Sequence, residues 1–159
     1  VNAVDPAIAQ NIYAWVSYDH KIYSGKMGAE LLLARQKEGI RKAAEYGLIV
    51  KINTILIPDI NNQHIKHLAS EVRELGADLL NLVPLIPIGS TNFASKRAPS
   101  KEELIRGRDI ARHYINIMQH CQQCRADAVG LLGNDQSIQF KDNLHSNYCY
   151  PARKCKVTV

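Results

Sequence analysis

The chain has 159 residues, of which 46% are hydrophobic and 22% charged, and this composition is typical of a globular domain with a core. The formal charge of +5 is modest and the Lys and Arg residues are scattered, which argues against a nucleic-acid-binding function. No apolar run approaches the ~20 residues of a membrane span, so no membrane partner is expected. Four cysteines without a signal peptide favour a reducing, cytoplasmic setting, where paired thiols more often bind metal than form disulfides.

The chain begins with a short apolar stretch, residues 1–4, that predicts the end of a strand and therefore a fragment of a longer fold. Asp5 then offers a helix N-cap, and apolar residues recur at helical spacing, which predicts a helix over about Pro6–Val16. The polar residues 17–27 predict a loop that leaves room for a short hairpin around Lys21–Tyr23.

The next stretch predicts a helix, a strand and a second helix. Apolar spacing predicts a helix over Ala29–Tyr46, and Gly47 follows in a position that ends helices. Leu48–Ile57 is rich in β-branched residues and apolar on both faces toward its end, which favours a covered parallel strand. After a turn, an amphipathic helix is expected from Ile65 to Leu75.

The same alternation continues through residue 119. Asp78–Ile86 predicts another largely apolar strand, and Pro87–Pro99 predicts a long loop. Ser100 and Glu103 have the spacing of a capping box, which predicts the start of a helix that runs to about Gln119 and delivers the cysteine pair at its end.

Strands alternating with helices of this length predict an α/β fold with parallel strands joined by right-handed crossovers. A doubly wound sheet and part of a barrel both fit this order, and in either fold ligands bind at the carboxyl ends of the strands. These ends are expected at Asn2–Asp5, Ile57–Asn62 and Pro84–Thr91. The sequence has no G-x-G-x-x-G and no P-loop, so a dinucleotide or nucleoside triphosphate fold has no support.

The segment His120–Gly130 carries the clearest chemistry. Cys121 and Cys124 are three residues apart, so both thiolates can bind one zinc ion or iron–sulfur cluster. Arg125 is placed to hydrogen-bond cluster sulfides or offset thiolate charge, and Asp127 is placed to orient Arg125. On spacing alone, a redox dithiol, half of a zinc site, and two unpaired thiols at a helix end beside a surface ion pair remain alternatives.

Cys121–Gly130 resembles the C-x-x-C-R-x-D-A-x-G signature of the NifB family, radical S-adenosylmethionine (SAM) proteins of nitrogenase cofactor assembly. Four other stretches are similar to that family, namely Val1–Pro6, Ile12–Val16, Gly28–Leu33 and Lys51–Pro58. The resemblance covers about residues 1–133 and implies an incomplete (β/α) barrel, of which this chain would supply roughly the C-terminal half.

The resemblance also implies an activity, which belongs to the parent protein. In this family two [4Fe–4S] substrate clusters are fused, and a carbon from SAM becomes the central carbide of the nitrogenase cofactor precursor. A third, catalytic cluster sits on a C-x-x-x-C-x-x-C loop that does not occur in these 159 residues. The fragment alone is therefore expected to be inactive and to hold no catalytic residue. Iron–sulfur cluster donors and other cofactor-assembly proteins are the implied partners.

The resemblance assigns metal roles only within the cysteine motif. Cys121 and Cys124 would ligate a substrate cluster. Arg125 and Asp127 would interact with these ligands without binding the metal themselves. His120 is a further ligand or hydrogen-bond donor, although a histidine at the end of a helix is more often structural.

Two asparagines are candidates for contact with SAM. Asn2 matches the residue that closes the family's T-x-T-x-N motif, at a strand end where polar groups of the cofactor would lie. Asn53 is a second candidate, and an asparagine satisfied within a covered strand is the alternative for it. Asp59 stands where such turns usually have Gly, which predicts a less relaxed turn.

Residues 1–133 are thus expected to form a partial barrel with the cysteine motif, and 134–159 a weakly ordered tail. Cys149 and Cys155 in that tail lack metal-site spacing and are interpreted as incidental. Two further function classes stay open: a non-catalytic carrier of iron–sulfur clusters, and a different radical SAM enzyme with an auxiliary cluster on the Cys pair.

Overall fold

The structure is a computed structural model, and it describes residues 1–89, 91–118, 130–131 and 134–135. The chain divides into two compact units, Val1–Gln123 and Cys124–Val159. The first unit holds almost all of the described residues. In the second unit, β6 (Gly130–Leu131) pairs antiparallel with β7 (Asn134–Asp135).

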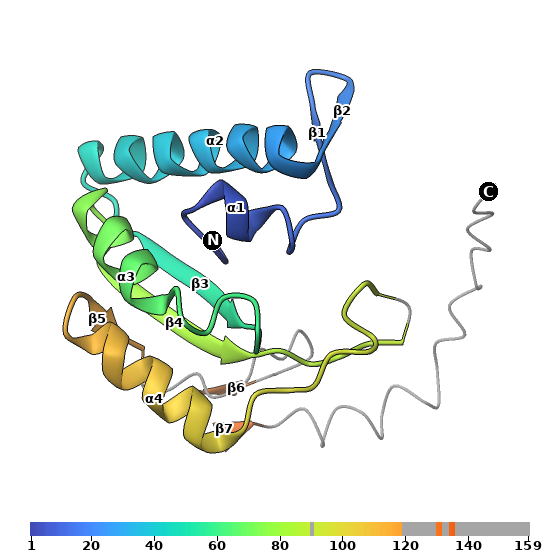
Figure 1. Ribbon diagram of the computed structural model, residues 1–159. Coiled ribbons are helices and arrows are strands. Elements are labelled where there is room, and N and C mark those ends of the chain that lie inside the picture. The colour runs from blue at the N-terminus through green and yellow to red at the C-terminus, as the bar shows by residue number, and fades with distance from the viewer. Residues whose placement is uncertain (90, 119–129, 132–133, 136–159) are drawn as a thin grey trace, which may run out of the picture. The chain divides into compact units, whose positions relative to one another are not determined.

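The centre of the first unit is a parallel sheet with the order β3-β4-β5. Its strands are β3 (Lys51–Leu56), β4 (Leu79–Pro84) and the short β5 (Asn116–Ile117). The helix α3 (Ile65–Glu74) connects β3 to β4, and α4 (Lys101–Arg112) connects β4 to β5 (Figure 1). The predicted α/β class with parallel strands is confirmed, and the sheet is consistent with part of a barrel.

One face of this sheet packs against α3 and α4. Alternate residues of β3 and β4 point to this face and join apolar residues of both helices in a single buried cluster. Its fully buried members include Leu56, Leu68, Val72, Leu80 and Leu82. Burying each of these side chains stabilises the fold by roughly 1.5–3 kcal/mol, so this layer supplies most of the cohesion of the first unit.

The two central strands differ in how well their other face is covered. Burial alternates along β3, where Lys51, Asn53 and Ile55 are exposed, whereas the four middle residues of β4 are all buried. The prediction of a covered strand over Leu48–Ile57 is therefore wrong for β3, whereas the largely apolar strand predicted over Asp78–Ile86 agrees with the buried β4. The second face of the sheet, which we call the far face, is the side of β3 and β4 that carries Asn53, Ile55, Asn81 and Val83.

The predicted helix over Pro6–Val16 is wrong beyond its first turn. The helix α1 spans only Pro6–Ala9, with the Asp5 carboxylate accepting from the Ala7 N–H as the expected N-cap. Trp15–Tyr18 instead forms β1, which pairs with β2 (Lys21–Ser24) in an antiparallel hairpin. Val16 lies opposite Tyr23, and this cross-strand pair suits β-branched and aromatic residues better than a helix does.

The hairpin anticipated around Lys21–Tyr23 is thus confirmed. Its two-residue turn, Asp19-His20, has φ values of 50° and 59°, which match the right-handed twist of the paired strands. The following helix α2 spans Gly25–Glu45 and begins four residues earlier than predicted, directly after Ser24, the last residue of β2, whose side chain makes no capping hydrogen bond. Gly47 has a φ of 72° and ends the helix as predicted.

The helix α4 begins as predicted and ends earlier. Ser100 and Glu103 form the complete capping box, and Arg97 adds two hydrogen bonds to the Glu103 carboxylate. The helix ends at Arg112 rather than at about Gln119, because Asn116–Ile117 pairs with β4 as a third parallel strand. A strand therefore stands between α4 and the cysteine motif, and the expected delivery of the Cys pair by a helix end is wrong.

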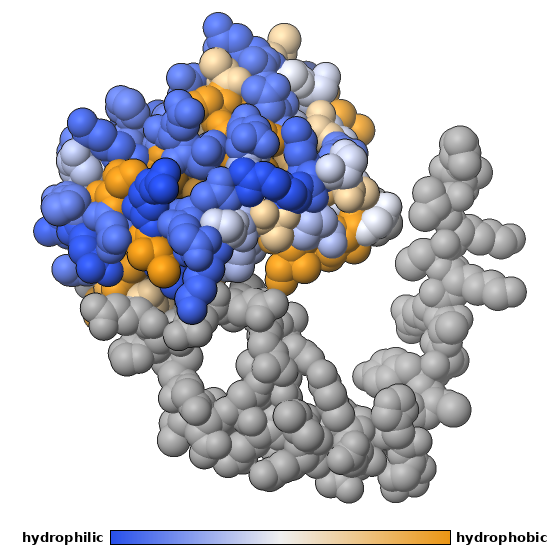
Figure 2. All heavy atoms as spheres, turned by 60° about the horizontal axis from the view of Figure 1, so that its bottom comes forward, coloured by the Kyte–Doolittle hydropathy of each residue, from blue (hydrophilic) through white to orange (hydrophobic). Residues whose placement is uncertain are grey.

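The surface of the described residues is mainly polar. Figure 2 shows hydrophilic residues over most of the face it presents, with apolar residues gathered in separate patches. Among the described helices, none combines the length and the apolarity that crossing a membrane requires.

Asn61 joins three segments behind the end of β3. Its Oδ1 accepts from the Ile57 N–H at 2.7 Å, and its Nδ2 donates to the carbonyls of Ile55 at 2.8 Å and Asn2 at 2.9 Å. The side chain is fully buried. Asn61 therefore closes the turn after β3 and holds the first residues of the chain against it.

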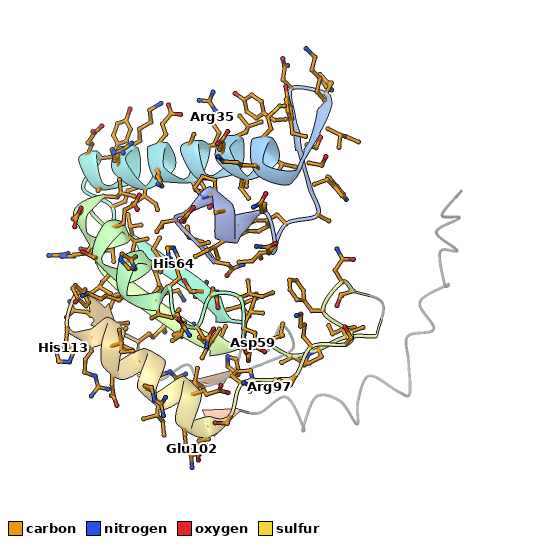
Figure 3. The ribbon with its side chains drawn as sticks, in the orientation of Figure 1. Arg35, Asp59, His64, Arg97, Glu102 and His113 are labelled. Atoms are coloured by element: carbon orange, nitrogen blue, oxygen red, sulfur yellow. The ribbon has the colours of Figure 1, made fainter. Side chains whose placement is uncertain are left out.

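His64 and Lys37 hold the same N-terminal segment at Val4. His64 accepts from the Val4 N–H through Nε2 at 3.2 Å, and Lys37 donates to the Val4 carbonyl at 3.1 Å while pairing with Glu71. Figure 3 shows His64 on the side of α3 that faces this segment. Burial, and secondly the neighbouring His67, lower the pKa of His64 below its usual 6.5, so the ring is held in the neutral form that can accept.

Replacing Asn61 by Ala should lower the free energy of unfolding by about 3 kcal/mol, because one buried N–H and two carbonyls lose their partner. Urea unfolding of the two proteins measures the difference. Gln63→Ala, at an exposed position in the same turn, is the control and should stay within about 0.5 kcal/mol of the wild type. Equal effects of the two substitutions would contradict the bridging role of Asn61.

Stability should also fall as the pH is lowered from about 7.5 to about 5.5. Since the pKa of His64 is lower in the folded than in the unfolded chain, the unfolded chain binds the proton first, and stability is lost as pH falls through 6.5 toward the lowered pKa. His64→Gln keeps an acceptor but does not titrate, so its unfolding free energy should change less over this range. A pH dependence identical to that of the wild type would contradict the role of His64.

Candidate functional site

The candidate site is built where β3, the turn after it and the N-terminal segment meet. Residues 1–2 lie along the edge of β3 that is not paired with β4: Thr54 donates from Oγ1 to the Val1 carbonyl at 2.7 Å. The Ile55 N–H donates to Asn2 Oδ1 at 2.9 Å. The segment that was predicted as the end of a strand is not part of the sheet, yet it follows the edge of β3 through these bonds.

Asn2, predicted to contact a cofactor, already uses the oxygen of its side-chain amide in a hydrogen bond to the protein. Its Oδ1 binds the backbone of β3, and its carbonyl accepts from Asn61. The half-buried side chain is therefore held in place beside the strand, and the amide group that remains for a ligand is Nδ2. This geometry fits a residue that presents a donor from a fixed position.

Asn53, the second predicted contact, is exposed on the far face of β3. The parallel register places Asn81 of β4 directly opposite it, and Asn81 Nδ2 donates to Asn53 Oδ1 at 3.1 Å. Asn81 is only 3% exposed, and its Oδ1 has no hydrogen-bond partner. The structure therefore brings the predicted Asn53 together with an asparagine that the sequence reading had not selected.

The turn after β3 adds charge near this edge. Asp59 has a φ of 63°, a conformation that glycine adopts more easily, and this fits the expected less relaxed turn. Its carboxylate lies close enough to Arg97 to help raise the pKa of that guanidinium, after the larger effect of the Glu103 hydrogen bonds (Figure 3). In the same arrangement Arg97 lowers the pKa of Glu103 to about 2. Arg97 and Glu103, with Asp59 nearby, therefore form a charged group at the loop that follows β4.

The residues predicted to bind metal lie outside the described part of the chain. These are Cys121 and Cys124 with His120, Arg125 and Asp127. Cys149, Cys155 and the expected tail also lie there. Within residues 1–89, 91–118, 130–131 and 134–135, no three His, Cys, Asp or Glu residues come together in a group that could hold a metal ion. The metal assignment therefore stays a prediction.

Three residues of this region were not predicted as site residues from the sequence: Asn61, His64 and Asn81. Asn81 had a visible signal, because it interrupts an apolar run at the same position of its strand as Asn53. Asn61 and His64 had none, since turn and helix-start residues of these types are common, and the bonds that join them to Asn2 and Val4 span 59 and 60 residues of the sequence.

No protein-family model matches the chain. Curated proteins named FeMo cofactor biosynthesis protein NifB do match it. The protein from Methanocaldococcus infernus is 46% identical over 144 residues, which are 89% of this chain and 47% of that protein. The protein from Bradyrhizobium diazoefficiens is 42% identical over 147 residues, 90% of this chain and 30% of that protein. The protein from Klebsiella pneumoniae is 42% identical over 144 residues, 88% and 31% respectively.

These identities run through nearly the whole chain, whereas the chain spans less than half the length of each of these relatives. The resemblance inferred from the cysteine signature and the strand motifs is confirmed. The chain is therefore homologous to one segment of the NifB proteins.

Proposed function

We propose that this chain is part of a radical SAM enzyme that fuses two [4Fe–4S] substrate clusters and inserts a carbide to make the nitrogenase cofactor precursor. The observation that carries the proposal is the signature Cys121-x-x-Cys124-Arg125-x-Asp127 within a chain 38–46% identical to NifB proteins. The relatives' name supports a role in FeMo cofactor biosynthesis, and the parallel sheet is compatible with part of the barrel that the proposal requires.

In this proposal the cofactor SAM, when bound, supplies both the radical and the methyl carbon. The chain itself would bind and orient SAM at the unpaired edge of β3 and on the far face of the sheet. Asn2 offers its Nδ2 from a position fixed by Ile55 and Asn61. Asn53 offers its Nδ2 beside the unpartnered acceptor of Asn81. This set of amide donors and an acceptor fits a ligand as polar as SAM.

Cys121 and Cys124 are proposed to ligate one of the substrate clusters. Thiolates bind iron well, and a spacer of two residues lets both sulfurs approach one cluster. Two thiolates leave a four-iron cluster incompletely ligated, so further ligands must come from elsewhere. Arg125 directly follows Cys124 in the sequence, and its cationic side chain would offset the charge of the thiolates.

Radical formation requires a catalytic cluster whose C-x-x-x-C-x-x-C loop is absent from these 159 residues. The proposal therefore assigns this chain to substrate-cluster binding and part of the cofactor contact. Cluster donors and other cofactor-assembly proteins would be its partners, in a cytoplasmic setting.

The decisive test replaces Cys121 and Cys124 together by Ala in the protein that carries this sequence. The expected result is loss of about one cluster's worth of reconstituted iron and of precursor formation, with SAM cleavage retained, because the catalytic cluster uses other thiolates. Iron content, precursor yield and 5′-deoxyadenosine release are the three measurements.

The matched control is the double substitution of Cys149 and Cys155 by Ala, which should leave all three quantities unchanged. Unchanged iron and full precursor formation in Cys121→Ala/Cys124→Ala would remove the pair from the mechanism. If the variant loses iron and the wild type itself does not cleave SAM, the results would favour a cluster carrier instead of a radical enzyme.

A further inference from the structure

Asn81 lies on the far face of the sheet, in the middle of β4. Its neighbours in β4, Leu80 and Leu82, belong to the core that packs against α3 and α4, so Asn81 points away from the helices. The register places it opposite Asn53, which is exposed on the same face. The pair therefore joins a buried amide to one that solvent reaches.

The hydrogen bonding of this pair is incomplete. Asn81 Nδ2 donates to Asn53 Oδ1, while Asn81 Oδ1 is buried without a partner. Most buried polar side-chain atoms are hydrogen-bonded, and leaving one unpaired costs roughly 1–3 kcal/mol. Since Asn53 Oδ1 is engaged by Asn81, the Nδ2 of Asn53 is directed away from that bond. Together the pair offers an acceptor beside a donor.

We propose that Asn81 is a further ligand-binding residue of the SAM site, in which its Oδ1 accepts a hydrogen bond from an N–H or O–H group of the bound cofactor while its Nδ2 orients Asn53. This inference rests on the proposed function. An amide oxygen can only accept, so the ligand must present a donor there. SAM has donors of two kinds: the ammonium of its amino-acid part, and the hydroxyls and amino group of its adenosine part.

The test is calorimetric titration of the protein that carries this sequence with two probes. SAM has both kinds of donor, and 5′-methylthioadenosine has only the adenosine kind. Asn81→Leu removes the acceptor and should weaken SAM binding about tenfold, which corresponds to one hydrogen bond in a buried site. Asn81→Asp retains an acceptor and should bind SAM within about threefold of the wild type, or more tightly if the donor is the ammonium.

The second probe identifies the donor. Equal binding of 5′-methylthioadenosine by the wild type and Asn81→Leu would assign the bond to the ammonium, and a parallel loss would assign it to the adenosine part. Both results support the inference. Because Asn81→Leu also frees Asn53, Asn53→Ala and the double variant are measured too. A further loss in the double variant, beyond Asn53→Ala alone, shows that Asn81 acts directly.

Two results would overturn the inference, and they differ. If the wild type binds SAM and Asn81→Leu binds it within about twofold, the inference fails and the proposed function stands. If the wild type does not bind SAM, the proposed function fails and the inference with it. Thermal unfolding of each variant confirms that it is folded. If Asn81→Leu does not fold, Asn81→Asp decides the question: binding within about threefold of the wild type supports the inference, and a loss of about tenfold overturns it.

Discussion

The buried amide of Asn61 is the contact on which the arrangement of the candidate site depends. Its three hydrogen bonds connect the end of β3, the turn that follows, and the first residues of the chain. No apolar contact could replace them, because each partner is a backbone group that needs a polar match once it is buried. Without this contact, Asn2 would lose its fixed position beside the strand.

The N-terminal segment is held mainly by polar contacts of this kind. His64 and Lys37 bind the two backbone groups of Val4 from α3's N-cap position and from α2. The His64 contact depends on charge state, because the ring must be neutral to accept, and burial lowers the pKa of His64. Lys37 also pairs with Glu71. The position of the segment is therefore sensitive to pH in a way that the apolar core under α3 and α4 is not.

The two faces of the sheet have separate tasks. The face under α3 and α4 is mainly apolar, apart from the buried Thr54, and stabilises the fold. The far face carries the amide pair of Asn53 and Asn81 in the middle of the strands, where a polar group stabilises little and an unpaired acceptor costs free energy. A sequence under selection for stability alone would place an apolar residue at position 81, so we interpret the pair as a binding feature.

The sequence by itself determined the element types that depend on neighbouring residues: the α/β class, the capping box of Ser100 and Glu103, the glycine end of α2 and the turn at Asp59. It also determined the relationship to NifB, because a short motif of two cysteines, an arginine and an aspartate is readable without a structure. Its misjudged boundaries, at Val16 and Gln119, fall where residues expected to be helical pair as strands: Trp15–Tyr18 with the next strand in a hairpin, and Asn116–Ile117 with the distant β4.

Only the tertiary structure decided which polar residues meet. Asn53 faces Asn81 because of a parallel register across 28 residues, and Asn61 reaches Asn2 across 59. Such contacts follow from how the strands and the N-terminal segment pack, and hydrophobic periodicity has no information about them. The local chemistry of the chain therefore identified its similarity to NifB proteins and most of its secondary structure, whereas long-range packing decided which partners the candidate asparagines meet.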